Sequence, residues 1–200
     1  MSTTVDYCFT PVSPWAYLGH ARFVQILKDT GAAVNVRPVD YGAIFPVSGG
    51  LPLPKRAPQR QAYRLVELQR FSTHLGLPLN LKPAFFPVSG DAASKLIVAA
   101  DLACGAMAAL DLAGRMGRAV WAEERNLADP DVLQALLAEV GLPAALMADS
   151  ARPEVAAACA GYTEQAIEAG VFGAPSYVID GEIFWGQDRL DFVERRLRAG

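Results

Sequence analysis

The feature that most constrains the fold is the placement of β-strand patterns at the two ends of the chain, with only helical patterns between them. Residues 4–10 and 33–39 alternate apolar and polar side chains, as half-buried strands do. Near the other end, residues 176–179 and 182–185 flank Asp180-Gly181, a dipeptide that strongly favours a two-residue hairpin turn. Strands at both ends with helices between them predict one sheet assembled from distant segments.

A helix is predicted directly after the first strand. Ser13-Pro14 is a strong start signal, because a serine hydroxyl caps free backbone N–H groups and proline suits the first helical position. Gly31 is expected to end this helix. Strand, helix and strand then form a right-handed βαβ unit. Pro38 places the second strand at an edge of the sheet, because proline cannot donate to the ladder.

The middle of the chain is predicted to be mostly helical. Residues 42–60 are rich in Gly and Pro and are expected to form a long loop of the kind that often has a function. Helical patterns follow at residues 61–74, 92–117, 130–140 and 153–169. This order of elements predicts a helical insertion into the unit that carries the sheet.

Composition and charge exclude several classes of protein. Apolar residues make up 52% of the 200 residues, which is enough for a core, and the net charge of −3 argues against a nucleic-acid partner. The three cysteines are far apart and only two histidines are present, so neither a disulfide framework nor a zinc site is expected. No signal peptide or membrane span is predicted. We therefore expect a cytoplasmic protein that does not bind a membrane.

The order of elements is that of an α/β thioredoxin-like fold with a large inserted α-helical subdomain. Residues 1–42 and 170–200 would form the thioredoxin-like domain, and residues 43–169 the inserted loop and helices, the last of which could pack on the sheet. Redox proteins of this fold carry C-x-x-C at the start of the first helix, where the helix dipole stabilises a thiolate. Here residues 13–16 read Ser-Pro-Trp-Ala, so a dithiol oxidoreductase is excluded. Pro175 stands where such folds keep a cis-proline facing the active site.

An anion site with a hydroxyl donor remains at the predicted helix N-terminus. Ser13 could stabilise a thiolate that belongs to another molecule, and glutathione is the obvious candidate in a reducing compartment. Ser13 could also act only as the helix cap.

Three segments resemble the 2-hydroxychromene-2-carboxylate isomerases, which are relatives of the kappa-class glutathione transferases in the DsbA-like group. They are SPWAYLG at residues 13–19, the Tyr63-x-x-x-Glu67-x-x-Arg70 pattern, and GVFGAPSYVIDGEIFWGQDRLDFVE at residues 170–194. The resemblance implies a glutathione-dependent isomerase of 2-hydroxychromene-2-carboxylate or a related aromatic or enone acid. In that chemistry the thiolate adds transiently to the substrate, a bond rotates, the ring opens, and glutathione is regenerated.

The resemblance also implies roles for individual residues. Ser13 would be the catalytic residue beside the glutathione sulfur, and the backbone of Ala174 would pair with the cysteine portion of glutathione. Asp188 would bind the γ-glutamyl ammonium, and Arg60 would lie near the glycine end. The full set of expected glutathione-binding residues is Ser13, Pro14, Trp15, Arg60, Ala174, Pro175, Gln187 and Asp188.

The expected substrate site departs from the family pattern. Naphthalene-pathway isomerases carry a lysine and an asparagine in the loop after the second strand, and this chain aligns Phe45 and Gly50 with them. Lys55 or Arg56 could supply the missing polar contacts. The expected substrate residues are Phe45, Gly50, Lys55, Arg56, Tyr63 and Trp185.

Several alternatives stay open at this point. The same site would serve a kappa-like glutathione transferase or peroxidase that consumes glutathione, and the fold would also serve a non-enzymatic binding module. Asp188 could cap the last helix as well as bind a ligand, and Glu67 and Arg70 could form only a surface ion pair. The family resemblance favours a homodimer.

Overall fold

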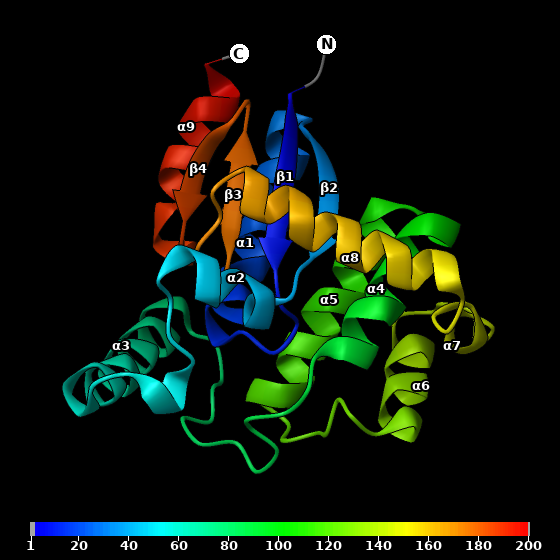
Figure 1. The fold of residues 1–200 in the computed structure, drawn as a ribbon, viewed down its shortest axis with the longest axis horizontal. Coiled ribbons are helices and arrows are strands. Elements are labelled where there is room, and N and C mark those ends of the chain that lie inside the picture. The colour runs from blue at the N-terminus through cyan, green and yellow to red at the C-terminus, as the bar shows by residue number, and fades with distance from the viewer. Residues whose placement is uncertain (1–2, 200) are drawn as a thin grey trace.

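The computed structural model describes residues 3–199, and its centre is a four-stranded sheet (Figure 1). The strands are β1 (Thr4–Phe9), β2 (Ala33–Pro38), β3 (Ser176–Ile179) and β4 (Glu182–Trp185). Their order is β2-β1-β3-β4; β1 pairs with β2 in parallel and with β3 antiparallel, and β3 pairs with β4 antiparallel. The two ends of the chain therefore share one sheet with β2 at its edge, which confirms the predicted thioredoxin-like arrangement.

Helices account for most of the chain between these strands, and α9 follows them. They are α1 (Pro14–Thr30), α2 (Tyr41–Ser48), the short 3₁₀ helix η1 (Leu53–Lys55), α3 (Pro58–Leu75), α4 (Asp91–Cys104), α5 (Ala106–Trp121), α6 (Pro130–Glu139), α7 (Leu146–Asp149), α8 (Pro153–Glu168), the 3₁₀ helix η2 (Gln187–Arg189) and α9 (Leu190–Arg198). Within residues 3–199, no helix combines the length and the apolar character that a bilayer span requires.

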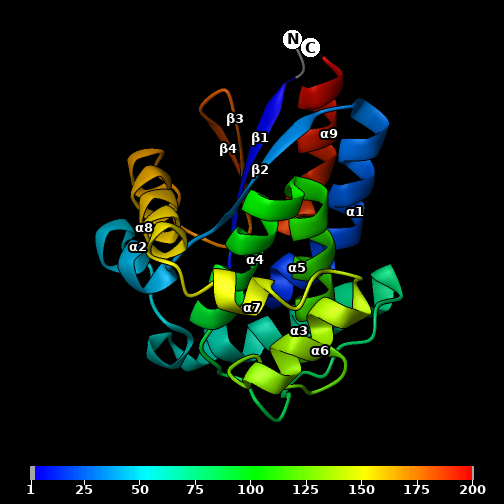
Figure 2. The same cartoon turned by 90° about the vertical axis from the view of Figure 1, so that its right-hand side faces the viewer.

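The sheet is covered on both faces, because alternate side chains of a strand point in opposite directions. Tyr7 and Tyr177 lie in the main core with α1, α4 and α5, whereas Cys8 and Val178 pack in a smaller cluster with α2 and α8. Figure 2 shows α1 and α9 on one side of the sheet and α2 and α8 on the other. The main core continues without interruption from the sheet into the inserted helices.

The prediction of a loop over residues 42–60 was wrong, because α2 and η1 lie in this segment. Asp40 caps α2, since its carboxylate accepts a hydrogen bond of 2.7 Å from the backbone N–H of Gly42. Tyr41 and Ile44 are buried against the sheet. This burial stabilises a helix that contains Pro46, a residue that intrinsic propensity disfavours there.

Two further boundaries differ from the predicted ones. The helix predicted over residues 92–117 is two helices, because Gly105 has φ 87°, a left-handed value that ends α4 and precedes α5. The helix predicted over residues 61–74 begins earlier, with Pro58 in its first turn. The hairpin and its turn lie where they were predicted.

Candidate functional site

The N-terminus of α1 has the cap that the sequence predicts. The Ser13 hydroxyl accepts a hydrogen bond of 3.2 Å from the backbone N–H of Ala16, and the Ser13 N–H donates to the carbonyl of Thr10 at 3.0 Å. No acidic residue lies in the first turn of α1. Within residues 3–199, no hydrogen bond uses the hydroxyl proton of Ser13 as donor. The buried hydroxyl can therefore cap the helix and donate to an anion at the same time.

The loop before β3 is held by several hydrogen bonds. The Ala174–Pro175 peptide bond is cis, as predicted. The carbonyl of Gly173 accepts hydrogen bonds from the hydroxyls of Tyr41 at 2.9 Å and Ser176 at 2.7 Å. These bonds fix the position of Ala174, which lines a pocket at this edge of the molecule.

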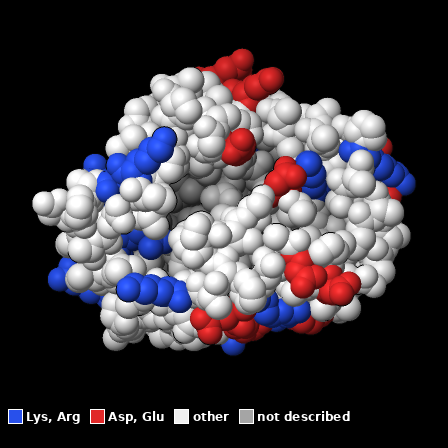
Figure 3. All heavy atoms as spheres, turned by 60° about the horizontal axis from the view of Figure 1, so that its bottom comes forward, with Lys and Arg blue, Asp and Glu red and all other residues white. Residues whose placement is uncertain are grey.

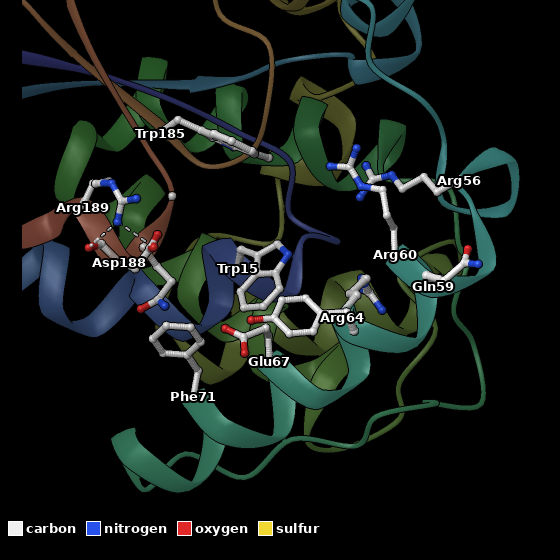
Figure 4. A pocket seen from close by; sticks show the side chains of 14 residues that line it. Trp15, Arg56, Gln59, Arg60, Arg64, Glu67, Phe71, Trp185, Asp188 and Arg189 are labelled. Atoms are coloured by element: carbon white, nitrogen blue, oxygen red, sulfur yellow. Dashed lines mark hydrogen bonds and ion pairs between the residues drawn. The ribbon is translucent and has the colours of Figure 1, made fainter.

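The pocket has a volume of about 490 Å³, which is within the range of small-molecule sites. Its walls come from the first turn of α1, from α3 and the segment before it, and from the end of the hairpin. The lining residues are Trp15, Arg56, Gln59, Arg60, Tyr63, Arg64, Glu67, Phe71, Ala174, Trp185, Gly186, Gln187, Asp188 and Arg189. Arginines lie at one end and the Asp188–Arg189 pair at the other, with the two tryptophans between them (Figure 4).

The structure brings many of the predicted site residues into this pocket. Those that line it are Trp15, Arg56, Arg60, Tyr63, Ala174, Trp185, Gln187 and Asp188. Those that do not are Ser13, Pro14, Phe45, Gly50, Lys55 and Pro175. Ser13 and Pro175 are each within two residues of a lining residue in the chain.

Phe45 and Gly50 lie away from the pocket and pack on each other. A side chain at Gly50 would collide with the ring of Phe45, which also packs 5.6 Å from the ring of Tyr41. The guanidinium of Arg56 lies over the ring of Phe45, 5.9 Å from its centre. Phe45 thus contacts a pocket arginine without lining the pocket itself. Lys55 is exposed and does not line the pocket.

The arginine end of the pocket carries concentrated positive charge. Burial and, to a smaller extent, the nearby charge of Arg56 together lower the pKa of Arg64 to about 10. Burial and, to a smaller extent, the charge of Arg60 also lower the pKa of Arg56. Basic side chains lie along one side of the hollow on this face, and acidic side chains lie across from them (Figure 3). This end is suited to an anionic ligand.

The other end of the pocket contains both a carboxylate and a buried amide. Asp188 is exposed and forms an ion pair with Arg189 at 2.7 Å. It lies in η2 and does not cap α9, so its predicted capping role was wrong; Arg189 occupies the cap position without a side-chain hydrogen bond. Gln187 is 1% exposed, and both polar atoms of its amide lack a hydrogen-bond partner within the described chain. A buried amide without a partner is costly, and a ligand in the pocket could satisfy it.

Aromatic side chains form the walls between the two ends. Trp15 packs edge-on against Phe71 of α3, with ring centres 6.0 Å apart. Trp185 is 49% exposed and contacts Phe172 edge-on at 4.8 Å. Such surfaces suit a flat apolar ligand. Glu67 and Arg70 form the predicted ion pair at 2.5 Å, and the Arg70 hydrogen bond lowers the pKa of Glu67.

A family model for the DSBA-like thioredoxin domain matches residues 4–198. The chain belongs to the DsbA-like thioredoxin family. A 2-hydroxychromene-2-carboxylate isomerase of Sphingobium xenophagum is 28% identical over 98% of this chain and 99% of its own length. A protein of the same name from Pseudomonas putida is 29% identical over 96% of this chain and 93% of its own length. These matches confirm the resemblance to the isomerases that the sequence motifs indicate.

Solved structures of DsbA-like proteins share the fold. A 2-hydroxychromene-2-carboxylate isomerase superposes with a TM-score of 0.80 at 23% identity, covering 98% of this chain and 95% of that one. The cytosolic disulfide reductase DsbM from Pseudomonas aeruginosa, solved with GSH, gives a TM-score of 0.69 at 20% identity, covering 98% and 99%. Within this DsbA-like frame, Ser13 stands at the helix N-terminus where a redox protein of this fold would carry its first cysteine.

Part of the pocket was not predicted from the sequence. Gln59, Arg64 and Phe71 line it but were not predicted as site residues. A signal for Arg64 was present, because Arg60 and Arg64 are four residues apart and so share one face of a helix.

Proposed function

We propose that this protein is a glutathione-dependent isomerase of 2-hydroxychromene-2-carboxylate or a related aromatic or enone acid. The observation that carries the proposal is the combination of a serine cap with a free hydroxyl proton and a pocket beside it with cationic and acidic ends. A chain with serine and alanine in place of the two cysteines has no dithiol at this position, so a thiol that acts there would come from a ligand. The names of the relatives support the same assignment.

The pocket offers groups that match the parts of glutathione. Arg60 would bind the glycine carboxylate, and the backbone of Ala174 would pair with the cysteine portion. Asp188 would bind the γ-glutamyl ammonium once Arg189 moves aside, and the unpartnered amide of Gln187 would bond to the same end. Ser13 would donate its hydroxyl proton to the sulfur.

When bound, glutathione supplies a thiolate that adds reversibly to the electrophilic carbon, permits rotation about the former double bond, and is expelled unchanged. Ser13 and the N-terminus of α1 both stabilise the anionic sulfur, the first by a hydrogen bond and the second through the helix dipole. Trp15 and Trp185 hold the flat substrate near that sulfur and exclude water from it. No side chain of the protein forms a covalent bond in this scheme.

We place this activity in the cytoplasm, where glutathione is abundant, and we propose that the protein acts as a homodimer, as the family resemblance favours. Sedimentation of the purified chain at several concentrations measures its oligomeric state. A monomer at all concentrations contradicts the second statement and leaves the first unchanged.

Titration calorimetry with glutathione tests the cofactor, and turnover of 2-hydroxychromene-2-carboxylate tests the reaction. We expect glutathione to bind at one site, isomerisation to require it, and the concentration of free thiol to stay constant during turnover. S-methylglutathione is the matched control, because it keeps the charged groups of glutathione but cannot form a thiolate, and it should inhibit competitively. Turnover without glutathione contradicts the proposal. Loss of one thiol per turnover identifies a glutathione transferase instead.

A further inference from the structure

Three arginines of the pocket differ from most other arginines of the protein. Among residues 3–199, every arginine forms an ion pair with a carboxylate except Arg56, Arg60, Arg64 and Arg195. The first three line the pocket. Arg195 lies on α9, is exposed, and has no part in the pocket lining. Positive charge without a carboxylate partner is thus gathered at one end of one cavity.

Two of these guanidinium groups are held in place by aromatic rings. Arg64 lies 5.7 Å from the ring centre of Phe86 and 5.8 Å from that of Trp121, which is fully buried. Arg56 lies 5.9 Å from the ring centre of Phe45, and its Nε donates a hydrogen bond of 2.8 Å to the carbonyl of Leu51. Stacking fixes the plane of a guanidinium and leaves its edge free to bind a carboxylate.

The number of charges exceeds what glutathione needs at this end. Glutathione has one carboxylate in its glycine residue, and the exposed Arg60 at the start of α3 is suited to it. Arg56 and Arg64 would then remain as two fixed cations that repel each other, with no anion to neutralise them. An anionic group that enters the pocket would relieve the repulsion within this half-buried pair.

We propose that Arg56 and Arg64 form a receptor for an acidic group of the second substrate and determine its specificity. The inference rests on the proposed function, because it assigns Arg60 to glutathione. Aromatic carboxylates then bind with the ring between the tryptophans and the carboxylate at the two arginines. Neutral aromatic electrophiles of the same shape bind weakly, because they leave both cations unpaired.

The test compares cinnamate with its neutral analogue cinnamamide, in the presence of saturating S-methylglutathione, by titration calorimetry. The wild-type protein should bind cinnamate at least tenfold more tightly than cinnamamide. Arg64→Met should lower that ratio about tenfold, mainly through cinnamate, and change the affinity for S-methylglutathione less than twofold. Arg195→Met is the matched control, because it removes an unpaired arginine outside the pocket, and it should leave the ratio unchanged.

The outcomes separate the two proposals. A ratio in Arg64→Met equal to that in wild type or in Arg195→Met overturns the receptor. Failure of S-methylglutathione to bind, together with a cinnamate preference that Arg64→Met abolishes, overturns the glutathione-dependent function and leaves the receptor. Circular dichroism reports whether Arg64→Met folds. If it does not, Arg56→Met and Arg64→Lys decide, and both should lose a large part of the preference for cinnamate.

Discussion

Replacing Ser13 by alanine removes a hydroxyl that has two separable tasks. The lost hydrogen bond to the N–H of Ala16 should lower the free energy of unfolding by about 1 kcal/mol, the usual value for an N-cap. The lost donor should destabilise the thiolate of bound glutathione. A free thiol has a pKa of about 8.5, and each unit of pKa corresponds to about 1.4 kcal/mol. Because the helix dipole remains, we expect the bound thiol's pKa to rise by about one unit.

The pH dependence of binding has a defined sign. A site that prefers the thiolate lowers the pKa of the bound thiol below that of free glutathione, so affinity rises with pH between those two values and is constant above the higher one. In Ser13→Ala the pH range over which affinity rises should become narrower, because the pKa of the bound thiol, which is its lower limit, increases. Turnover near neutral pH should fall by up to about tenfold, because a rise of one unit in the pKa lowers the ionised fraction of the bound thiol by at most that factor.

The ultraviolet absorbance of the thiolate, measured as a function of pH in the glutathione complex, tests this reasoning. Asp129→Ala is the matched control, since Asp129 caps α6 by accepting a hydrogen bond of 2.9 Å from the N–H of Asp131 and is not among the residues that line the pocket. This variant should lose a similar amount of free energy of unfolding, and the thiol of its bound glutathione should titrate as in the wild-type complex. If the curves of wild type and Ser13→Ala superimpose, Ser13 is only a helix cap and the proposed role of its hydroxyl is refuted.

Asp188→Asn should weaken glutathione binding by about 1 kcal/mol, a modest loss because the exposed carboxylate already pairs with Arg189. Arg189→Gln should strengthen glutathione binding, because it frees that carboxylate. If calorimetry finds neither change, Asp188 is not part of the site. Burial lowers the pKa of His20 to about 4, whereas an unfolded histidine has a pKa of about 6.5. Stability should therefore be constant above about pH 6.5 and fall as pH decreases toward 4, with about 2 kcal/mol lost at pH 5. Urea unfolding at pH 7 and pH 5 measures this loss in the free energy of unfolding, and His20→Gln should reduce it. If the variant loses as much stability as wild type between these pH values, the role of His20 is contradicted.

Local signals predicted the two ends of the fold well. Asp180 and Gly181 have φ values of 50° and 83°, and such left-handed pairs match the twist of a hairpin, so the dipeptide determines the turn. Ser13 and Pro14 likewise determine where α1 begins, through one hydrogen bond and one fixed dihedral angle. These elements were predictable because the forces that form them act between residues adjacent in sequence.

Elements that depend on tertiary packing were not predictable in this way. The helix α2 contains Pro46 and forms because Tyr41 and Ile44 are buried against the sheet, which no local pattern reveals. Asp188 had a favourable position for a helix cap, but the chain first makes the short helix η2 and Asp188 pairs with Arg189. For α2, long-range contacts outweighed the local preference, whereas at Asp188 one local interaction replaced another.

The candidate site was predictable mainly where a family motif covered it. Residues near the ends of the chain, such as Trp15 and Asp188, come from motifs and do line the pocket. Arg64 has no motif, and its importance depends on the absence of a carboxylate partner, which is a property of the folded protein. A sequence shows where charges are, but it does not show which of them remain unpaired.

Gly19 connects the two motifs at the ends of the chain into one site. A Cβ atom at this position would lie 2.7 Å from the Cβ of Gln187, so only glycine lets η2 pack this closely on α1. This contact holds the amide of Gln187 in the pocket wall without a partner, at a cost of about 1–3 kcal/mol while the pocket is empty. A ligand that bonds to the amide recovers this energy. Gly19 therefore both permits the close packing of η2 on α1 and keeps the amide of Gln187 available for a polar ligand.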